Sequence, residues 1–164
     1  MSASVTPHRH ALALGELGSL AGAGALAGLC GGAAMAALAM LLSATAGASA
    51  FRPIEAVASL ALGGDALRGA PAIGVLIVGL ALHALVSMAL GMLFAGAFAQ
   101  FPLEVLVPVG LLYGLAILVL ARFVVLPAAD LGPAGALVAE HLAYGGSLWL
   151  ILFFRQSIER SPRA

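Results

Sequence analysis

The sequence predicts an all-α membrane protein: four transmembrane helices in an up-down bundle, with a short interfacial helix between the first two. Of its 164 residues, 63% are hydrophobic and 9% are charged, whereas roughly a quarter are charged in an average soluble domain. Four stretches each contain about 20 predominantly apolar residues, which is the length that a helix needs to cross the hydrocarbon core of a membrane. Because a segment in lipid must satisfy its own backbone hydrogen bonds, four such stretches indicate a helical bundle.

The expected spans are residues 17–43, 72–99, 103–126 and 134–154, and together they make residues 1–164 one transmembrane domain. Charged residues and prolines fall mostly between the spans: Arg52, Pro53, Glu55, Asp65, Arg68 and Pro71, then Pro102 and Glu104, then Pro127, Asp130 and Pro133. The tails and connections are short, so we expect no soluble catalytic domain.

The first span is rich in glycines at helical spacing, which lie at Gly18, Gly22, Gly24, Gly28 and Gly32. Lipid provides no hydrophobic drive for helix association, so membrane helices pack through small residues that let backbones approach. These five positions therefore predict helix packing. The spacing leaves open whether the partner is internal or another protein, and we expect self-association or another membrane subunit at this face.

A short helix is expected at residues 53–62, between the first two spans. Pro53 suits a first helical turn, apolar residues recur at helical spacing, and Gly63 with Gly64 provides a stop. Such a helix fits the membrane interface. A lid or re-entrant gate is the alternative.

The second span places five residues on one line, four apart: Gly79, His83, Ser87, Gly91 and Ala95. His83 therefore lies on a packed face. It is about eleven residues, or roughly 16 Å, from the helix start, which places it near the bilayer centre.

The third and fourth spans carry the ionisable residues Arg122, Glu140 and His141. Arg122 and Glu140 both lie within roughly 10 Å of the connection that joins their helices. Unpaired charges are costly there, so we expect a structural ion pair. A proton or ion pathway is the alternative. His141 points about 100° away from Glu140.

His83 and His141 are each expected to bond to a neighbouring helix or to a carbonyl group. An alternative uses both, because two neutral imidazoles on parallel helices are suitable axial ligands for haem b. Glycines at 79, 91, 145 and 146 would then provide space for a porphyrin.

Composition and motifs exclude several functional classes. Cys30 is the single cysteine, which excludes an internal disulfide and a multi-cysteine metal site, and the balanced charge gives no basic field for nucleic acid. Ser43, Ser87 and Ser147 lack an arranged triad, and no phosphate-binding glycine loop follows a strand. We therefore expect no enzyme, metal or cofactor.

The resulting hypothesis is a non-enzymatic accessory subunit that packs against other membrane helices. A haem-binding electron-transfer subunit and a small proton or solute transporter, using His83, Arg122 and Glu140, are the alternatives.

From His83 to Arg160 the chain resembles the YagU-like small bacterial inner-membrane proteins. The resemblance covers about half of the chain and rests on "HALVS" (83–87), "FVVLP" (123–127) and "HLAYG" (141–145). Glu140 departs from it, since a small residue is expected there. The resemblance implies a multi-pass inner-membrane protein with no assigned chemistry.

If both termini lie on the same side of the membrane, that side holds four of the seven arginines and the other side holds three. The larger set, with the tail "FFRQSIERSPR", favours both termini in the cytoplasm.

Overall fold

The computed structural model describes residues 7–68, 72–125 and 134–160, and all regular structure in these ranges is helical. The elements are α1 (Pro7–Thr45), α2 (Arg52–Leu62), the 3₁₀ turn η1 (Gly64–Leu67), α3 (Ile73–Phe98), α4 (Leu103–Leu120), the π-helical turn η2 (Ala121–Val125), α5 (Ala134–Ser147) and α6 (Leu150–Arg160). The predicted all-α class is confirmed for this part of the chain.

Four helical segments are long and apolar enough to cross a membrane: Gly15–Thr45, Ile73–Phe98, Leu103–Phe123 and Ala134–Ile158. They match the expected spans to within a few residues at most ends. The last residue of the third expected span, and the joint at Pro127, Asp130 and Pro133, lie outside the described residues.

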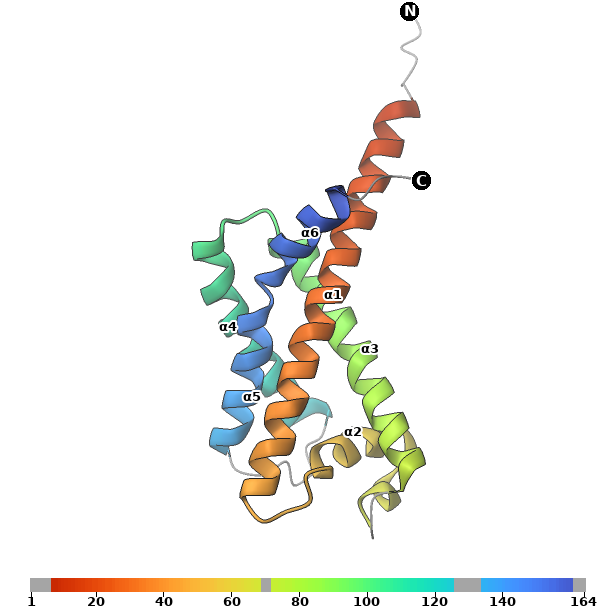
Figure 1. Ribbon diagram of the computed structural model, residues 1–164, viewed down its shortest axis with the longest axis vertical. Helices are drawn as coiled ribbons and strands as arrows, with labels where there is room; N and C mark the ends of the chain where they lie inside the picture. The colour runs from red at the N-terminus through yellow and green to blue at the C-terminus, as the bar shows by residue number, and fades with distance from the viewer. Residues whose placement is uncertain (1–6, 69–71, 126–133, 161–164) are drawn as a thin grey trace, which may run out of the picture.

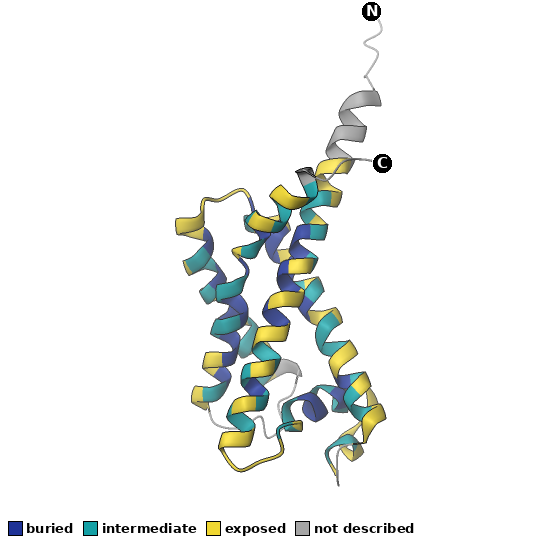
Figure 2. Ribbon diagram, in the orientation of Figure 1, coloured by how far each residue is buried: buried dark blue, intermediate teal, exposed yellow. Residues whose placement is uncertain are grey.

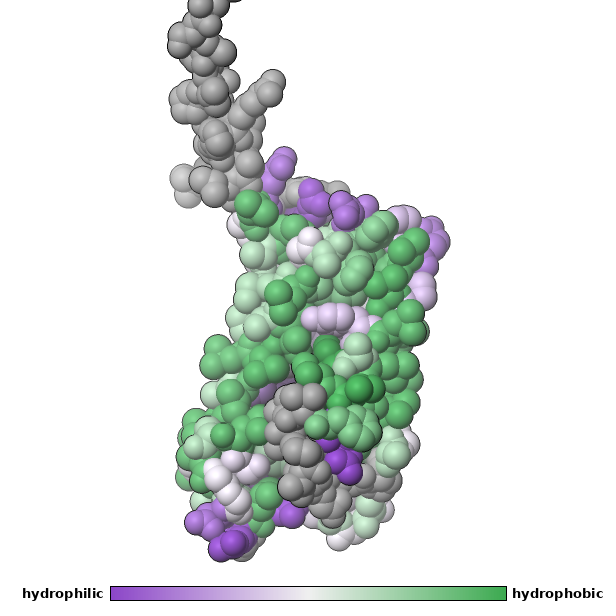
Figure 3. All heavy atoms as spheres, turned by 180° about the vertical axis from the view of Figure 1, so that it is seen from behind, coloured by the Kyte–Doolittle hydropathy of each residue, from purple (hydrophilic) through white to green (hydrophobic). Residues whose placement is uncertain are grey.

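The distribution of polarity is inverted relative to that of a water-soluble protein. Ile73 and Phe123 are 75% and 70% exposed, whereas Glu140 and His141 are 8% and 5% exposed. Figure 3 shows largely hydrophobic flanks, with the most hydrophilic residues gathered toward the two ends. Large apolar side chains outside and ionisable ones inside are what a lipid environment requires, so the chain has the features of an integral membrane protein.

Helix α1 organises the bundle. It packs on α3, α5, α6 and α2, while α4 packs on α5. Figure 1 shows α2 lying across one end of the bundle, and the start of α1 and the end of α6 at the other end. Figure 2 shows the buried positions on the sides of the helices that face one another. Since α3 and α4 each pack mainly on another helix, these two consecutive helices are free to diverge.

Two helix pairs are held together by direct approach of their backbones. Between α1 and α3, a Cβ atom added at Gly28 would fall on the carbonyl oxygen of Ser87. Between α4 and α5, a Cβ atom added at Gly110 would fall on the carbonyl oxygen of Gly145. A side chain at either glycine would therefore force these helices apart, which explains why small residues stand there.

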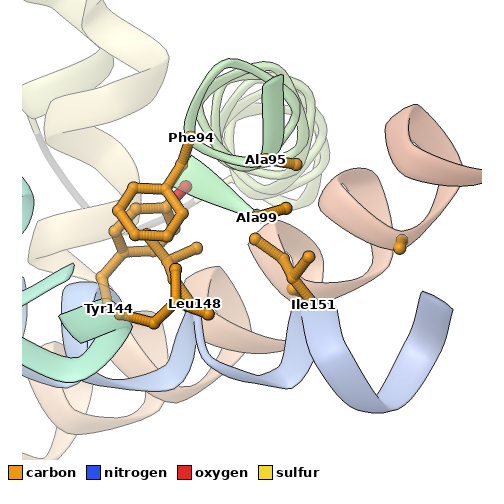
Figure 4. Close-up of a cluster of buried hydrophobic side chains, with 9 residues drawn as sticks. Phe94, Ala95, Ala99, Tyr144, Leu148 and Ile151 are labelled. Carbon is orange, nitrogen blue, oxygen red and sulfur yellow. The ribbon is translucent and has the colours of Figure 1, made fainter. Parts of the chain in front are cut away.

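The hydrophobic core joins α3, α4, α5 and α6 to α1. Its largest fully buried side chains are Phe94, Leu106, Leu148 and Ile151, with Tyr144 beside them. Figure 4 shows residues of this cluster gathered between the helices. This core lies toward the α6 end of the bundle and leaves the α2 end less filled.

The fourth span is broken, whereas the sequence predicted one continuous helix over 134–154. Helix α5 ends at Ser147 and α6 begins at Leu150. At the break, backbone bonds join residues three apart, as from the Leu148 N–H to the Gly145 carbonyl (3.3 Å). Two glycines and a serine precede the break, and glycine is a weak helix former. The tight turn lets α6 continue along α1.

Candidate functional site

A cavity of about 850 Å³ lies at the α2 end of the bundle. Helices α1, α2, α3, α4 and α5 all contribute to its wall. Most of the wall is apolar. Its larger apolar side chains are Met35, Leu42, Ile54, Val57, Leu60, Leu82, Val86, Leu90, Ile117, Leu120 and Leu137. A volume of this size is within the range of small-molecule sites, about 300 to 1,000 Å³.

Three of the sequence-predicted site residues line this one cavity: His83 from α3, and Glu140 and His141 from α5. Glu140 and His141 are both buried residues. In the sequence, each of the three is an ionisable group inside an apolar span. The structure brings all three to a common space.

Each histidine has one nitrogen bonded to a backbone carbonyl. His83 Nε2 lies 2.9 Å from the Gly32 carbonyl oxygen on α1, and His141 Nδ1 lies 2.8 Å from the Leu137 carbonyl oxygen. Because a carbonyl oxygen only accepts, the imidazoles donate in both bonds. In the neutral form, His83 Nδ1 and His141 Nε2 are therefore acceptors.

The other hydrogen-bonding side chains of the wall mostly donate to backbone carbonyls as well. The Tyr144 hydroxyl donates to Ser87 (2.8 Å), the Ser43 hydroxyl to Ser49 (2.7 Å) and Arg52 Nη1 to Leu67 (2.8 Å). Tyr144 thereby ties α5 to α3 beside the cavity. Tyr113, on α4, similarly donates to the Leu90 carbonyl of α3 (3.0 Å).

The Glu140 carboxyl differs from these groups. Within the described part of the chain it makes no hydrogen bond and no ion pair, although its residue is 92% buried. It lines the cavity, so its oxygen atoms are available to a molecule that enters.

Arg122 lies in the π-helical turn η2, at the end of α4, and is not among the residues that line the cavity. Its guanidinium carbon lies 5.8 Å from the centre of the Phe123 ring. Among the described residues, the salt bridge within 4 Å joins Arg68 and Asp65, at 2.9 Å. The predicted ion pair between Arg122 and Glu140 is not among the contacts of the described residues.

The glycines predicted for helix packing lie at different kinds of position. Gly24, Gly28 and Gly32 lie against α3, so the partner of this part of α1 is internal to the chain. Gly22 faces Ile158 of α6, and a Cβ atom at Gly18 would meet nothing within 4 Å.

The haem alternative fits this arrangement poorly. His83 uses Nε2, the usual haem-ligating nitrogen, to bond Gly32. The glycines expected to provide space for the porphyrin are occupied by neighbours: the backbone of Ile54 at Gly79, of Gly24 and Gly28 at Gly91 and of Gly110 at Gly145, and the Leu111 side chain at Gly146. These glycines serve close packing, and the space expected for a porphyrin is filled at these positions.

Sequence reasoning did not find the cavity, Tyr144 or Tyr113. The two tyrosines are visible in the sequence as polar groups within apolar spans, and that signal could have marked them. The cavity has no such signal, since it depends on how the helices pack. Among the described residues, no three His, Cys, Asp or Glu side chains are grouped so as to hold a metal ion.

Comparisons of the chain with protein-family models, with curated proteins and with solved structures find no match. The resemblance to YagU-like proteins therefore stays a prediction.

Proposed function

We propose that this protein is a non-enzymatic, multi-pass membrane protein that binds a small solute in its cavity, as a transporter does. The observation that carries the proposal is the buried carboxyl of Glu140 facing a cavity of about 850 Å³ between membrane-spanning helices. Ionisable residues inside a membrane protein usually face a substrate or ion pathway. His83 and His141 share the same wall, which adds to the support.

The proposed disposition is four crossings in alternating directions, with α2 in the interface. The start of α1 and the end of α6 lie at one end of the molecule, and α2 lies across the other end (Figure 1). Pro53 is in the first turn of α2, and Gly63 (φ 78°) follows its end. We further propose a bacterial inner membrane, with both termini in the cytoplasm.

An accessory-subunit role is a second proposal, and the packing of α1 within the chain limits where a partner can bind. Most of the glycine ridge of α1 lies against α3, so an outside partner would need another surface. The start of the first span offers one, because Leu17 is exposed and Gly18 has no neighbour within 4 Å. A partner there would contact the end of the bundle where α1 lies beside α6 (Figure 1).

Cysteine accessibility tests the solute-binding proposal. In a Cys30→Ala background, Ala39→Cys places a thiol on α1 at a buried position of the cavity wall. Ala37→Cys is the matched control, since it lies two residues away on the exposed side of the same helix. The reaction rate of each thiol with a small, water-soluble thiosulfonate is measured in proteoliposomes.

We expect the thiol at position 39 to react at least about tenfold faster, because a solute cavity admits water and the lipid does not. Reaction at position 39 that is no faster than at position 37 would overturn the proposal. The rate with reagent on one side and then the other tells which side the cavity opens to.

A further inference from the structure

The α5 wall of the cavity presents hydrogen-bond acceptors more than donors, whereas Arg52 on α2 carries guanidinium N–H groups besides the one that Nη1 donates. The hydroxyls of Tyr144 and Ser43 donate to backbone carbonyls of the protein, as does Nη1 of Arg52. Each histidine also donates through one nitrogen, which leaves the other as an acceptor. The Ser87 hydroxyl can donate or accept. On the α5 wall, the groups left to accept a hydrogen bond from a bound molecule are therefore the Glu140 carboxyl and His141 Nε2.

The charge in the wall gives a second argument. Its charged side chains are Glu140 on α5 and Arg52 on α2. The Arg52 guanidinium is bound to the Leu67 carbonyl, at the turn that follows α2. Glu140 has no such partner among the described residues. A carboxylate in apolar surroundings is stabilised by a cation that also donates hydrogen bonds.

We propose that the cavity binds a lipophilic amine in its protonated form, with the Glu140 carboxylate as its counter-ion. The ammonium N–H groups donate to Glu140 and to His141 Nε2, and the hydrocarbon body lies against the apolar residues of α1, α2 and α3. This inference rests on the proposed function, because it names the solute class that the same cavity takes.

A set of adamantane derivatives separates charge from shape. Equilibrium dialysis against the protein in lipid nanodiscs, corrected with empty nanodiscs, compares 1-adamantylammonium with adamantane-1-carboxylate, 1-adamantanol and the N,N,N-trimethyl ammonium derivative. The four share one apolar cage. We expect the primary ammonium to bind at least about tenfold more tightly than the other three, since it alone combines positive charge with N–H donors.

Glu140→Gln removes the charge while keeping the size of the side chain, and we expect it to weaken ammonium binding at least about tenfold. Glu55→Gln is the matched control, because Glu55 is also a buried acid but does not line the cavity; it should leave binding unchanged. Glu140→Asp should restore part of the affinity, which separates loss of charge from loss of folding.

The outcomes distinguish this inference from the proposed function. If the carboxylate or the alcohol binds as tightly as the ammonium, and Ala39→Trp abolishes that binding by filling the cavity, the cavity takes solutes but the amine preference is wrong. Unchanged ammonium binding in Glu140→Gln also overturns the amine inference. If no derivative binds above empty nanodiscs, and a thiol at position 39 is unreactive, both proposals fail.

Discussion

At the residue scale, the polar side chains inside the bundle are mostly bound to backbone carbonyls. His83, Tyr113 and Tyr144 each bond a carbonyl on a different helix, whereas His141 bonds within its own helix. A polar group in lipid must find a partner inside the protein, and backbone carbonyls are close where glycines let the helices approach. Glu140 is the exception among the buried groups that line the cavity, which is why the functional proposals centre on it.

The close contact at Gly28 makes the first prediction. Gly28→Ala adds one methyl group where the Ser87 carbonyl already lies, so α1 and α3 must separate. We expect a loss of about 1 to 3 kcal/mol in the free energy of unfolding, as for other overpacked sites. Unfolding in mixed micelles with increasing dodecyl sulfate measures it.

Gly18→Ala is the control for this prediction, since the added methyl group would meet nothing within 4 Å. Its stability should match that of the original chain. Equal stability of the two variants would mean that α1 and α3 are not in close contact.

At the scale of the element, α2 and α5 depart most from simple spanning helices. Helix α2 has 11 residues, too few to span a membrane, and its buried residues include Ile54 and Ala58. Helix α5 carries Glu140 and His141 on consecutive positions and ends at a break after 14 residues. Short and broken helices of this kind frequently surround solute sites in transporters, because they place polar groups inside the membrane.

The depth of α2 in the membrane is the second prediction. A nitroxide label at Leu62, which is exposed on α2 and does not line the cavity, should lie near the lipid headgroups if α2 is interfacial. A label at Leu85, exposed on α3 and about 18 Å from that helix's start by helical rise, should lie much deeper. Electron paramagnetic resonance with oxygen and a water-soluble nickel complex measures both depths. Equal depths would support the re-entrant gate instead.

At the scale of the whole molecule, the bundle consists of two tightly packed pairs, α1 with α3 and α4 with α5, joined mainly where α1 packs on α5. The core toward the α6 end holds large side chains such as Phe94 and Leu148. At the α2 end, both pairs contribute residues to the wall of the cavity. The hydrophobic core thus lies toward the α6 end of the molecule, and the cavity lies at the α2 end.

The sidedness of the chain is the third prediction. In a Cys30→Ala background, single cysteines at Glu16 and Ser157 should react with a membrane-impermeant maleimide from the same side, and a cysteine at Asp65 from the opposite side. All three positions are exposed. In the proposed four-crossing arrangement, an odd number of crossings separates Asp65 from each of the others, while an even number separates Glu16 from Ser157. Labelling of Glu16→Cys and Ser157→Cys from opposite sides would contradict the four-crossing arrangement.

The sequence by itself determined the environment and the four apolar segments, because the length and polarity of a spanning helix are set by the bilayer and are local properties of the chain. It also marked His83, Glu140 and His141, since ionisable groups are costly in lipid wherever the helices lie. Only the tertiary structure decided that Gly24, Gly28 and Gly32 lie against α3 and that the three ionisable residues share one cavity. Lipid gives no preference among apolar helix faces, so the pairing of helices, and the space left between them, depend on shape complementarity between segments distant in sequence.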